Sequence, residues 1–487
     1  MQKKLKKILA FIFSLILLCA FGMQISAYSP YENYTFDASG KRVSEPQAVI
    51  PVKTVDGSDI GVGHFSGLSD IYIRFDTLYL VDSGNNRIVI TDKNFNLIDE
   101  ITSFDNGGVT DTFNSPKGIF VTEKGEIFVC DTGKNRIVAL DKDKKVVMII
   151  TAPKTELLED GFAFMPLSVS VDNAGRIFAV AENVNQGIIE FDKNGNFQNF
   201  FGPIQTQPDL WKSFIKMFAT KEQKAQMTVT VPTEYSNIDI NSSGFVYGTV
   251  AVYDRENFSE NMLIHKLNPI GNDILERNGY ASPMGDVDYR IDEETGEYLT
   301  SKLIDIKSFE NQFYSVLDER NGRVFTYSED GFLLFVFGAL GQNLGQFKKP
   351  SAIEVNGNNF YVTDSEMNYI IEYQLTDYGS NIKNAVLAEG DMEYEKADEY
   401  WGKVLQNTAK SSFTYNRIGM SALKNGDYSQ AMKYLKLAEN RADYSTAYKY
   451  VRDTFFDKYF SILAIVLIGV ILFIIFIKII KGRRNKQ

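Results

Sequence analysis

A near-repeat of 49 residues dominates the first part of this chain. The run Asp-Ser-Gly-Asn-Asn-Arg-Ile at 82–88 returns as Asp-Thr-Gly-Lys-Asn-Arg-Ile at 131–137. Looser copies follow, with short stretches in which apolar and polar residues alternate, as they do in half-buried strands. A period of this length with about four strands per unit is typical of a propeller blade. Such a small sheet cannot bury its faces alone, so the units must stack in a ring.

Six such units can be aligned on the apolar residue that follows the central turn of each. These positions are separated by 49, 51, 76, 60 and 46 residues, and the longest gap holds an insertion at 207–227. Six units fall within the four to eight blades of known propellers. The predicted fold class is therefore mainly β, with a six-bladed β-propeller over residues 47–380. The aligned residues are Ile88, Ile137, Ile188, Ile264, Val324 and Ile370.

The two clearest units resemble the NHL-repeat propellers. The resemblance rests on Pro-Lys-Gly-Ile at 116–119, on Asp-Thr-Gly-Lys-Asn-Arg-Ile-Val at 131–138, and on the matching run of the first unit. It covers about residues 47–380 and weakens in the later units. The resemblance implies a ring that binds partners on its faces, and a shared fold does not by itself imply catalysis.

The two ends of the ring are expected to meet. The last unit lacks a final strand after Tyr373, whereas residues 47–56 have the pattern of a lone strand ahead of the first unit. We expect this early strand to complete the last blade, because closure removes an exposed sheet edge. Residues 28–46 are mostly polar and predict an extended lead-in.

The insertion at 207–227 has a helical pattern. Leu210, Phe214, Met217 and Phe218 recur at helical spacing, with lysines on other positions. This pattern predicts an amphipathic helix on the rim of the propeller. Two interpretations stay open, because such a helix can dock on a membrane or partner or can cover an exposed blade edge.

A helical segment follows the propeller and is predicted over residues 381–456. Tyr, Ala, Tyr and Trp at 394–401 return 34 residues later as Tyr, Ala, Tyr and Leu at 428–435, and Gly426-Asp427 predicts a turn between two helices. This period and motif resemble the tetratricopeptide repeats. Fewer than three full repeats are marginal alone, so we expect the helices to pack against the propeller or a partner. A peptide groove and a short spacer both stay open.

Both ends of the chain carry membrane-related patterns. Residues 1–27 combine four lysines, a short apolar stretch and a small-residue cleavage pattern, which predicts a signal peptide. Residues 457–480 predict a transmembrane helix, because 459–477 hold no charge and match the ~20 residues that a span needs. Five cations follow, so the positive-inside rule puts the tail at 481–487 in the cytoplasm. The propeller and helices are then extracellular, on a single-pass protein of the cell membrane.

Composition narrows the chemistry. The formal charge is −11, and without its basic ends the exported part carries about −20, which makes nucleic acid an improbable partner. Only Cys130 lies outside the predicted signal peptide, so no internal disulfide can form. His64 and His265 are isolated, and there is no Gly-x-Ser-x-Gly elbow or phosphate loop. These absences predict no zinc site, no catalytic set and no cofactor.

One set of acids is a candidate ligand site. Asp82, Asp131 and Asp364 end the second strand of their units, which in NHL-type blades lies at one face of the ring. Their units become neighbours once the ring closes. Glu182 and Asp318 are aligned one residue later in their own units. The sequence therefore predicts an acidic arc on one face.

The acidic arc has two interpretations. As a functional site, it binds a metal cation, sugar hydroxyls or a basic segment. As a structural feature, each Asp accepts backbone N–H bonds in its own turn or pairs with an arginine such as Arg87 or Arg136. The residue types alone favour the structural interpretation.

Two functions stay open. The first is a membrane-anchored binding or scaffolding module for a protein or carbohydrate partner, with no catalysis of its own. The second is a metal-dependent, lactonase- or lyase-like propeller enzyme, which holds a divalent ion in a central cage of carboxylates and amides. Calcium requires ligand oxygens about 2.5 Å from one common point. Convergence of the carboxylates is therefore the feature that separates the two functions.

Overall fold

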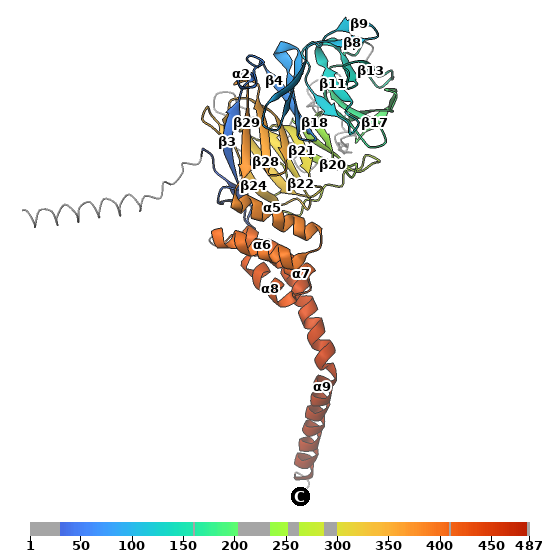
Figure 1. Ribbon diagram of the computed structural model, residues 1–487. Helices are drawn as coiled ribbons and strands as arrows, with labels where there is room; N and C mark the ends of the chain where they lie inside the picture. The colour runs from blue at the N-terminus through green and yellow to red at the C-terminus, as the bar shows by residue number, and fades with distance from the viewer. Residues whose placement is uncertain are drawn as a thin grey trace, which may run out of the picture. The chain divides into compact units, whose positions relative to one another are not determined.

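The computed structural model describes residues 30–158, 161–202, 234–251, 263–286, 300–408 and 411–484 (Figure 1). The predictions of a signal peptide at 1–27 and of a helix at 207–227 lie outside these ranges. The described chain contains six antiparallel sheets of three or four strands, followed by helices, which confirms the mainly β fold with a six-bladed propeller.

The first three blades each have four strands in sequence order. Tight turns that begin with Asp join the outer strands, and their fourth residue, Phe95, Lys144 or Gly195, has a positive φ. In blade 3, Asp192 Oδ1 accepts the N–H groups of Asn194 and Asn196. Blade 1 consists of β4 (Leu68–Arg74), β5 (Thr77–Asp82), β6 (Arg87–Asp92) and β7 (Leu97–Ile101). Blade 2 consists of β10 (Ile119–Val121), β11 (Ile127–Asp131), β12 (Arg136–Leu140) and β13 (Val146–Ile150). Blade 3 consists of β14 (Pro166–Val171), β15 (Ile177–Ala181), β16 (Ile188–Phe191) and β17 (Phe197–Phe201).

Blade 5 follows the same plan, whereas blade 4 has three described strands and blade 6 takes its fourth strand from the start of the chain. Blade 4 consists of β18 (Tyr235–Ile240), β19 (Val246–Val250) and β20 (Ile264–Leu267). Blade 5 consists of β21 (Leu303–Phe309), β22 (Phe313–Asp318), β23 (Arg323–Ser328) and β24 (Leu333–Phe337). Blade 6 consists of β27 (Pro350–Asn356), β28 (Asn359–Asp364), β29 (Tyr369–Leu375) and β3 (Val49–Val55).

Strand β3 closes the ring, as predicted. It pairs antiparallel with β29, from Ile370 opposite Val55 to Leu375 opposite Val49. The last blade thereby gains its fourth strand from a segment more than 300 residues earlier. Closure leaves the third strand of blade 6 paired on both sides, instead of exposing its backbone groups.

The expectation of an extended lead-in at 28–46 is wrong. The structure has a hairpin there, formed by β1 (Tyr34–Phe36) and β2 (Arg42–Ser44). Its turn is closed by Asp37, whose Oδ1 accepts the N–H groups of Ser39 at 2.8 Å and Lys41 at 3.0 Å. The outer strands of blade 3 are joined by the same Asp-x-x-Gly turn, and its sequence signal was visible at Asp37–Gly40. The hairpin lies against blade 5, where the N–H of Val336 donates to Asn33.

Several short elements lie on the face of the ring at which the second strand of each blade ends. They are the 3₁₀ turns η1 (Ser83–Asn85) and η2 (Thr132–Lys134), the helix α2 (Gly57–Ile60), the hairpin of β8 (Phe104–Asn106) and β9 (Val109–Asp111), and the parallel pair β25 (Ala339–Leu340) and β26 (Gln346–Phe347).

Five helices follow the propeller: α5 (Asp377–Gly390), α6 (Tyr394–Asn407), α7 (Ser412–Lys424), α8 (Tyr428–Leu437) and α9 (Arg441–Arg484). The first begins before the predicted boundary at 381, because the Thr376 side chain caps it by accepting the N–H of Gly379. The predicted turn at Gly426-Asp427 is confirmed, with Gly426 at φ 81° and Asp427 as the N-cap of α8.

The helices pack on the propeller, as expected. One apolar cluster contains Tyr373 of blade 6, Phe332 beside β24, Ile382 of α5 and Trp401 of α6, all of them buried. Lys383 of α5 donates to the backbone oxygen of Gly357 at 2.8 Å. Since the inner helices α5 and α7 use their packing face on the propeller, that face is not a free peptide groove.

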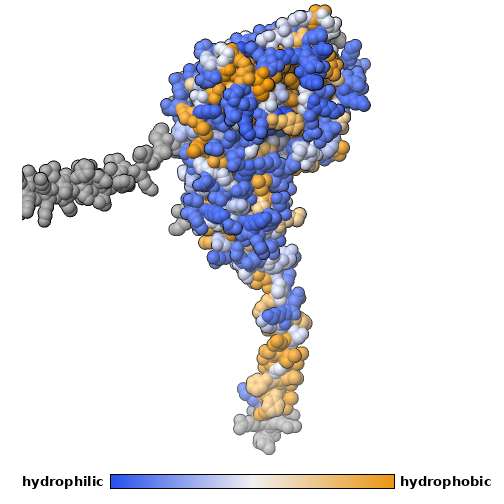
Figure 2. Space-filling view, in the orientation of Figure 1, coloured by the Kyte–Doolittle hydropathy of each residue, from blue (hydrophilic) through white to orange (hydrophobic). Residues whose placement is uncertain are grey.

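Helix α9 runs on from this bundle as one element of 44 residues. Its second half is mostly hydrophobic in the view of Figure 2. Within the described residues it is the one helix long and apolar enough to cross a membrane. The prediction that a final helix runs directly into the membrane span agrees with this continuity.

Candidate functional site

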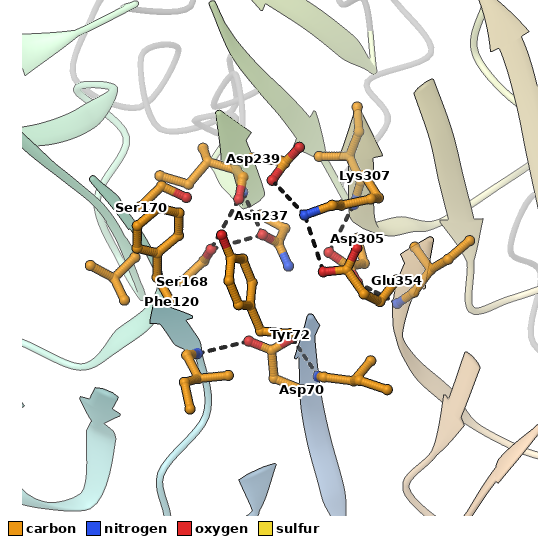
Figure 3. A pocket seen from close by; sticks show the side chains of 16 residues that line it. Asp70, Tyr72, Phe120, Ser168, Ser170, Asn237, Asp239, Asp305, Lys307 and Glu354 are labelled. Carbon is orange, nitrogen blue, oxygen red and sulfur yellow. Dashed lines mark hydrogen bonds and ion pairs between the residues drawn. The ribbon is translucent and has the colours of Figure 1, made fainter. Parts of the chain in front are cut away.

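The innermost strand of each blade places one side chain on the axis of the ring. In every blade this residue pairs with the residue three positions before the end of the second strand. Apolar residues flank it in five blades, and Ile306 and Ser308 flank it in blade 5. Because side chains alternate along a strand, these neighbours pack between blades while it points inward. We call these six residues the axial ring; in blade order they are Tyr72, Phe120, Ser170, Asp239, Lys307 and Glu354 (Figure 3).

The axial ring is charged on one side and uncharged on the other. Lys307 Nζ lies 3.1 Å from Glu354 Oε2 and 3.3 Å from Asp239 Oδ1. It also lies 4.8 Å from the centre of the Tyr72 ring. Burial lowers the pKa of Lys307, but Asp239 and Glu354 outweigh it and raise that pKa well above its usual value. Lys307 therefore stays protonated and is suited neither to proton abstraction nor to nucleophilic attack.

A second layer of acids joins neighbouring blades. Asp70 accepts the N–H of Ile71 in its own strand and that of Ile119 in blade 2, both at 2.8 Å. Asp305 does the same with Ile306 at 2.8 Å and with Ile353 in blade 6 at 2.6 Å. Each acid sits where the register of its inner strand shifts, which turns the carboxylate toward the next blade.

The space between these side chains is small. All six blades contribute to a cavity of about 30 Å³. That volume holds roughly one or two water molecules. Access to the axis by an organic substrate would therefore require the inner strands to move apart.

The acids of the axis make stability depend on pH. Burial raises the pKa of Asp70 to about 7, although its two backbone hydrogen bonds oppose the shift. The unfolded chain has a value near 3.9, so between about pH 4 and 7 the folded protein binds more protons. We expect wild type to gain stability relative to Asp70→Asn as the pH falls from 8 to 5, in thermal melts of both. Asp143→Asn, on an exposed turn, is the control, and parallel pH profiles of wild type and Asp70→Asn would refute the assignment.

The predicted acidic arc consists of buried carboxylates at the strand ends. Asp82, Asp131, Asp318 and Asp364 are all fully buried. The sequence alignment placed Asp318 one residue later than Asp82, and this is wrong. Asp318 pairs with Arg323 just as Asp82 pairs with Arg87, so the two acids are equivalent. The alignment matched Phe313 of β22 with Leu78 of β5. Phe313 lies five residues before the end of its strand and Leu78 only four, so Asp318 was placed one position late. Glu182 does follow the end of its strand and is exposed.

Each of these carboxylates is used by its own turn. Asp82 accepts the N–H of Ser66 and the Nε–H of Arg87, both at 2.7 Å. Asp131 accepts the N–H of Asn114 at 2.7 Å and the Nε–H of Arg136 at 2.8 Å. These contacts favour the structural interpretation of the arc. Further backbone donors reach Asp364 from Lys348, Lys349, Glu366 and Met367, and Asp318 from Lys302, Arg320 and Asn321.

The donor groups do not fit the cage of a divalent cation. Among the described residues, no group of three or more His, Cys, Asp or Glu side chains is placed to hold a metal ion. At the axis, the ammonium of Lys307 already neutralises Asp239 and Glu354. The buried carboxylates of the arc and of the axis are thus committed to arginine, lysine or backbone donors.

Asp131→Asn tests the role of the arc. We expect it to lower the free energy of unfolding by about 1–3 kcal/mol, because it removes a charge-assisted hydrogen bond to Arg136. Adding calcium is expected to leave the melting temperature of wild type unchanged. A calcium-dependent rise that Asp131→Asn abolishes would contradict this and revive a cation site.

A second cluster joins the propeller to the helices. Arg417 of α7 is 2% exposed, and its Nη1 lies 2.7 Å from Asp330 Oδ2 at the turn of blade 5. Its Nη2 pairs with Glu389 of α5, which also accepts the Nε1–H of Trp401 at 2.6 Å. The guanidinium carbon lies 5.2 Å from the centre of the Phe332 ring and 5.6 Å from the centre of the Trp401 ring. We call Arg417, Asp330, Glu389 and Trp401 the junction cluster.

Neither the axial ring nor the junction cluster was found from the sequence. The signal for the axial ring was present, because the inner strands contain Asp-Ile-Tyr-Ile, Ser-Val-Ser-Val, Asn-Ile-Asp-Ile and Ala-Ile-Glu-Val. In each of these four segments the third residue belongs to the axial ring, and an Ile or Val stands on either side of it. The junction cluster carries no comparable signal, since its members come from distant segments.

Comparison with known proteins gives only distant structural similarity. No protein-family model matches the chain, and no curated protein matches it. A solved virginiamycin B lyase from Staphylococcus aureus is 12% identical, with 70% of this chain and 87% of that one covered and a TM-score of 0.38. A streptogramin B lyase is 12% identical, covers 70% and 86%, and has a TM-score of 0.36. BamB from Moraxella catarrhalis is 10% identical, covers 68% and 98%, and has a TM-score of 0.33. Similarity at this level carries no inference about substrate or partner.

Proposed function

We propose that this protein is a membrane-anchored binding module that presents its propeller to a protein or carbohydrate partner outside the cell. The observation that carries the proposal is the junction cluster, in which a buried arginine ties blade 5 to α5 and α7. Helix α9 then continues from the bundle into the apolar span. A propeller fixed to its anchor in this way is suited to hold a binding surface at the membrane.

The axis does not favour the catalytic alternative. Its acids bond to backbone N–H groups of adjoining blades or to Lys307, and its cavity is about 30 Å³. The lyase-like alternative needs an open set of carboxylates and amides around a cation. No contact of the described residues favours that alternative.

The orientation in the membrane rests on charge. The cations at 478–486 follow the apolar span directly, and the positive-inside rule keeps such residues in the cytoplasm. Protease added to intact cells is expected to digest the propeller and to spare a tag placed after Gln487. A propeller protected in intact cells and digested after lysis would reverse the orientation.

The partner is best sought by crosslinking the full chain in native membranes. A photoreactive residue is placed at one exposed position at a time, on either face of the ring. We expect adducts from one face only, because a propeller partner docks on a face. The absence of adducts from both faces would contradict the proposed function. The positions are Asn85, Lys134, Glu182 and Glu366 for the face where second strands end, and Phe75, Lys124 and Lys193 for the opposite face.

A further inference from the structure

A polar cavity of about 260 Å³ lies where the propeller meets the helices. Blade 5 contributes Gln312 and the turn at Glu329, and the segment after β20 contributes Glu276. Helices α5 and α7 contribute Val386 and Lys424. We call this cavity the seam pocket. It is several times larger than the axial cavity and large enough for a small organic group.

The side chains that line the seam pocket carry more negative than positive charges. Of its cations, Arg417 is shared by Asp330 and Glu389, and Lys266 pairs with Glu329 at 2.6 Å. The four acids of the lining therefore face three cations, of which two are already used. Glu276 is exposed, and the contact described for its side chain is the amide of Asn278 at 2.9 Å.

Two helix ends add to this negative character. Helix α5 ends at Gly390 and helix α7 ends at Lys424, and both residues line the seam pocket. The carboxyl end of a helix carries about half a negative charge, because its last carbonyl groups lack partners within the helix. The pocket is thus electronegative from its backbone as well as from its side chains.

The pocket also holds an amide with free hydrogen-bonding capacity. Gln312 lies against α5, so closely that a Cβ on Gly390 would meet its Nε2 at 2.4 Å. The side-chain amide of Gln312 makes no hydrogen bond with the residues that the structure describes. An amide oxygen in this place can accept a bond from an N–H group that enters the pocket.

We propose that the seam pocket binds an organic cation, an ammonium or guanidinium group, carried by a free small amine or by a lysine or arginine side chain of a partner. Glu276 supplies the uncompensated carboxylate, and Gln312 supplies a neutral acceptor. Lys424 stands at the rim without an ion pair in the described structure and weakens the attraction. The two charges therefore act in opposite directions on the same ligand.

The experiment uses the full chain in detergent micelles, with agmatine as the cationic probe and propionate as the anionic one. Calorimetric titration is expected to show binding of agmatine and none of propionate. Glu276→Gln should weaken agmatine binding about threefold, and Lys424→Gln should strengthen it by a similar factor, as one partly exposed charge pair does. Glu123→Gln, exposed on blade 2, is the matched control and should change nothing.

Opposite signs at Glu276 and Lys424 distinguish a cation site from nonspecific attraction. Propionate binding, no agmatine binding, or equal affinities in wild type and both variants would overturn the proposal. A short amidated peptide with a central arginine separates the two sources. Tighter binding of the peptide than of agmatine assigns the pocket to a partner side chain, and the reverse assigns it to a free amine. The result does not depend on whether a face of the propeller captures a partner in membranes.

Discussion

Replacing Arg417 by Met is expected to lower the free energy of unfolding by about 3–5 kcal/mol, because it leaves the largely buried carboxylates of Asp330 and Glu389 without their shared cation. Burial already raises the pKa of Glu389, an effect that Arg417 opposes in the wild type. We therefore expect the helices to loosen from blade 5 before the propeller itself unfolds. Thermal melts of the full chain, followed by limited proteolysis between 377 and 440, would record both effects.

Arg452→Met is the matched control for this change. Arg452 lies on α9, is about half exposed and pairs with its neighbour Asp453. Exposed ion pairs contribute about 0–1 kcal/mol, so this variant should melt almost as wild type does. Equal melting of Arg417→Met and Arg452→Met would show that the junction cluster does not hold the helices to the propeller.

Replacing Val55 by Asp is expected to have an effect of similar size, at the opposite end of the chain. Val55 is 4% exposed, pairs with Ile370 and packs in a cluster with Leu68 and Tyr361. A carboxylate there is buried without a partner, which costs about 4 kcal/mol or more. Ring closure should fail, and hydrogen exchange in β29 should rise more than exchange in blade 3.

The same strand offers the control. Val52 lies where the pairing of β3 with β29 shifts register, and it is 47% exposed. Val52→Asp puts the same charge into water, so it should change stability by no more than about 0.5 kcal/mol. If Val55→Asp melted like Val52→Asp, strand β3 would not be what closes the ring.

Some parts of this structure follow from local patterns. A near-repeat at 49 residues with alternating polarity predicted blades, and the missing strand after Tyr373 predicted that β3 would close the ring. Short-range turns could also be predicted from the sequence. The turn predicted at Gly426-Asp427 separates α7 from α8. These features depend on residues close in sequence or on a count of strands. Periodicity and turn chemistry are sufficient for both.

Two predictions from the sequence were wrong, one because of a shift of one residue in the alignment and one because a turn motif was overlooked. Asp318 was placed one position late because the alignment followed the aromatic run, whereas the hydrogen-bonded pair with Arg323 sets its true position. The hairpin at 34–44 was missed although its Asp37 turn has the pattern of the blade turns. A slip of one residue moves a side chain to the other face of a strand, so the role of an acid cannot be assigned before its partner is known.

The sequence by itself determined the number of blades, their closure and the long apolar helix at the end of the chain, because periodicity, strand count and a charge-free run can be read along the sequence. Only the tertiary structure decided what the ionisable groups do. Asp239, Lys307 and Glu354 stand on three different blades, and Arg417 meets Asp330 from 87 residues away. Whether such a group is paired, protonated or open to a ligand depends on burial and on partners that the folded chain brings together, and no local pattern encodes those distances.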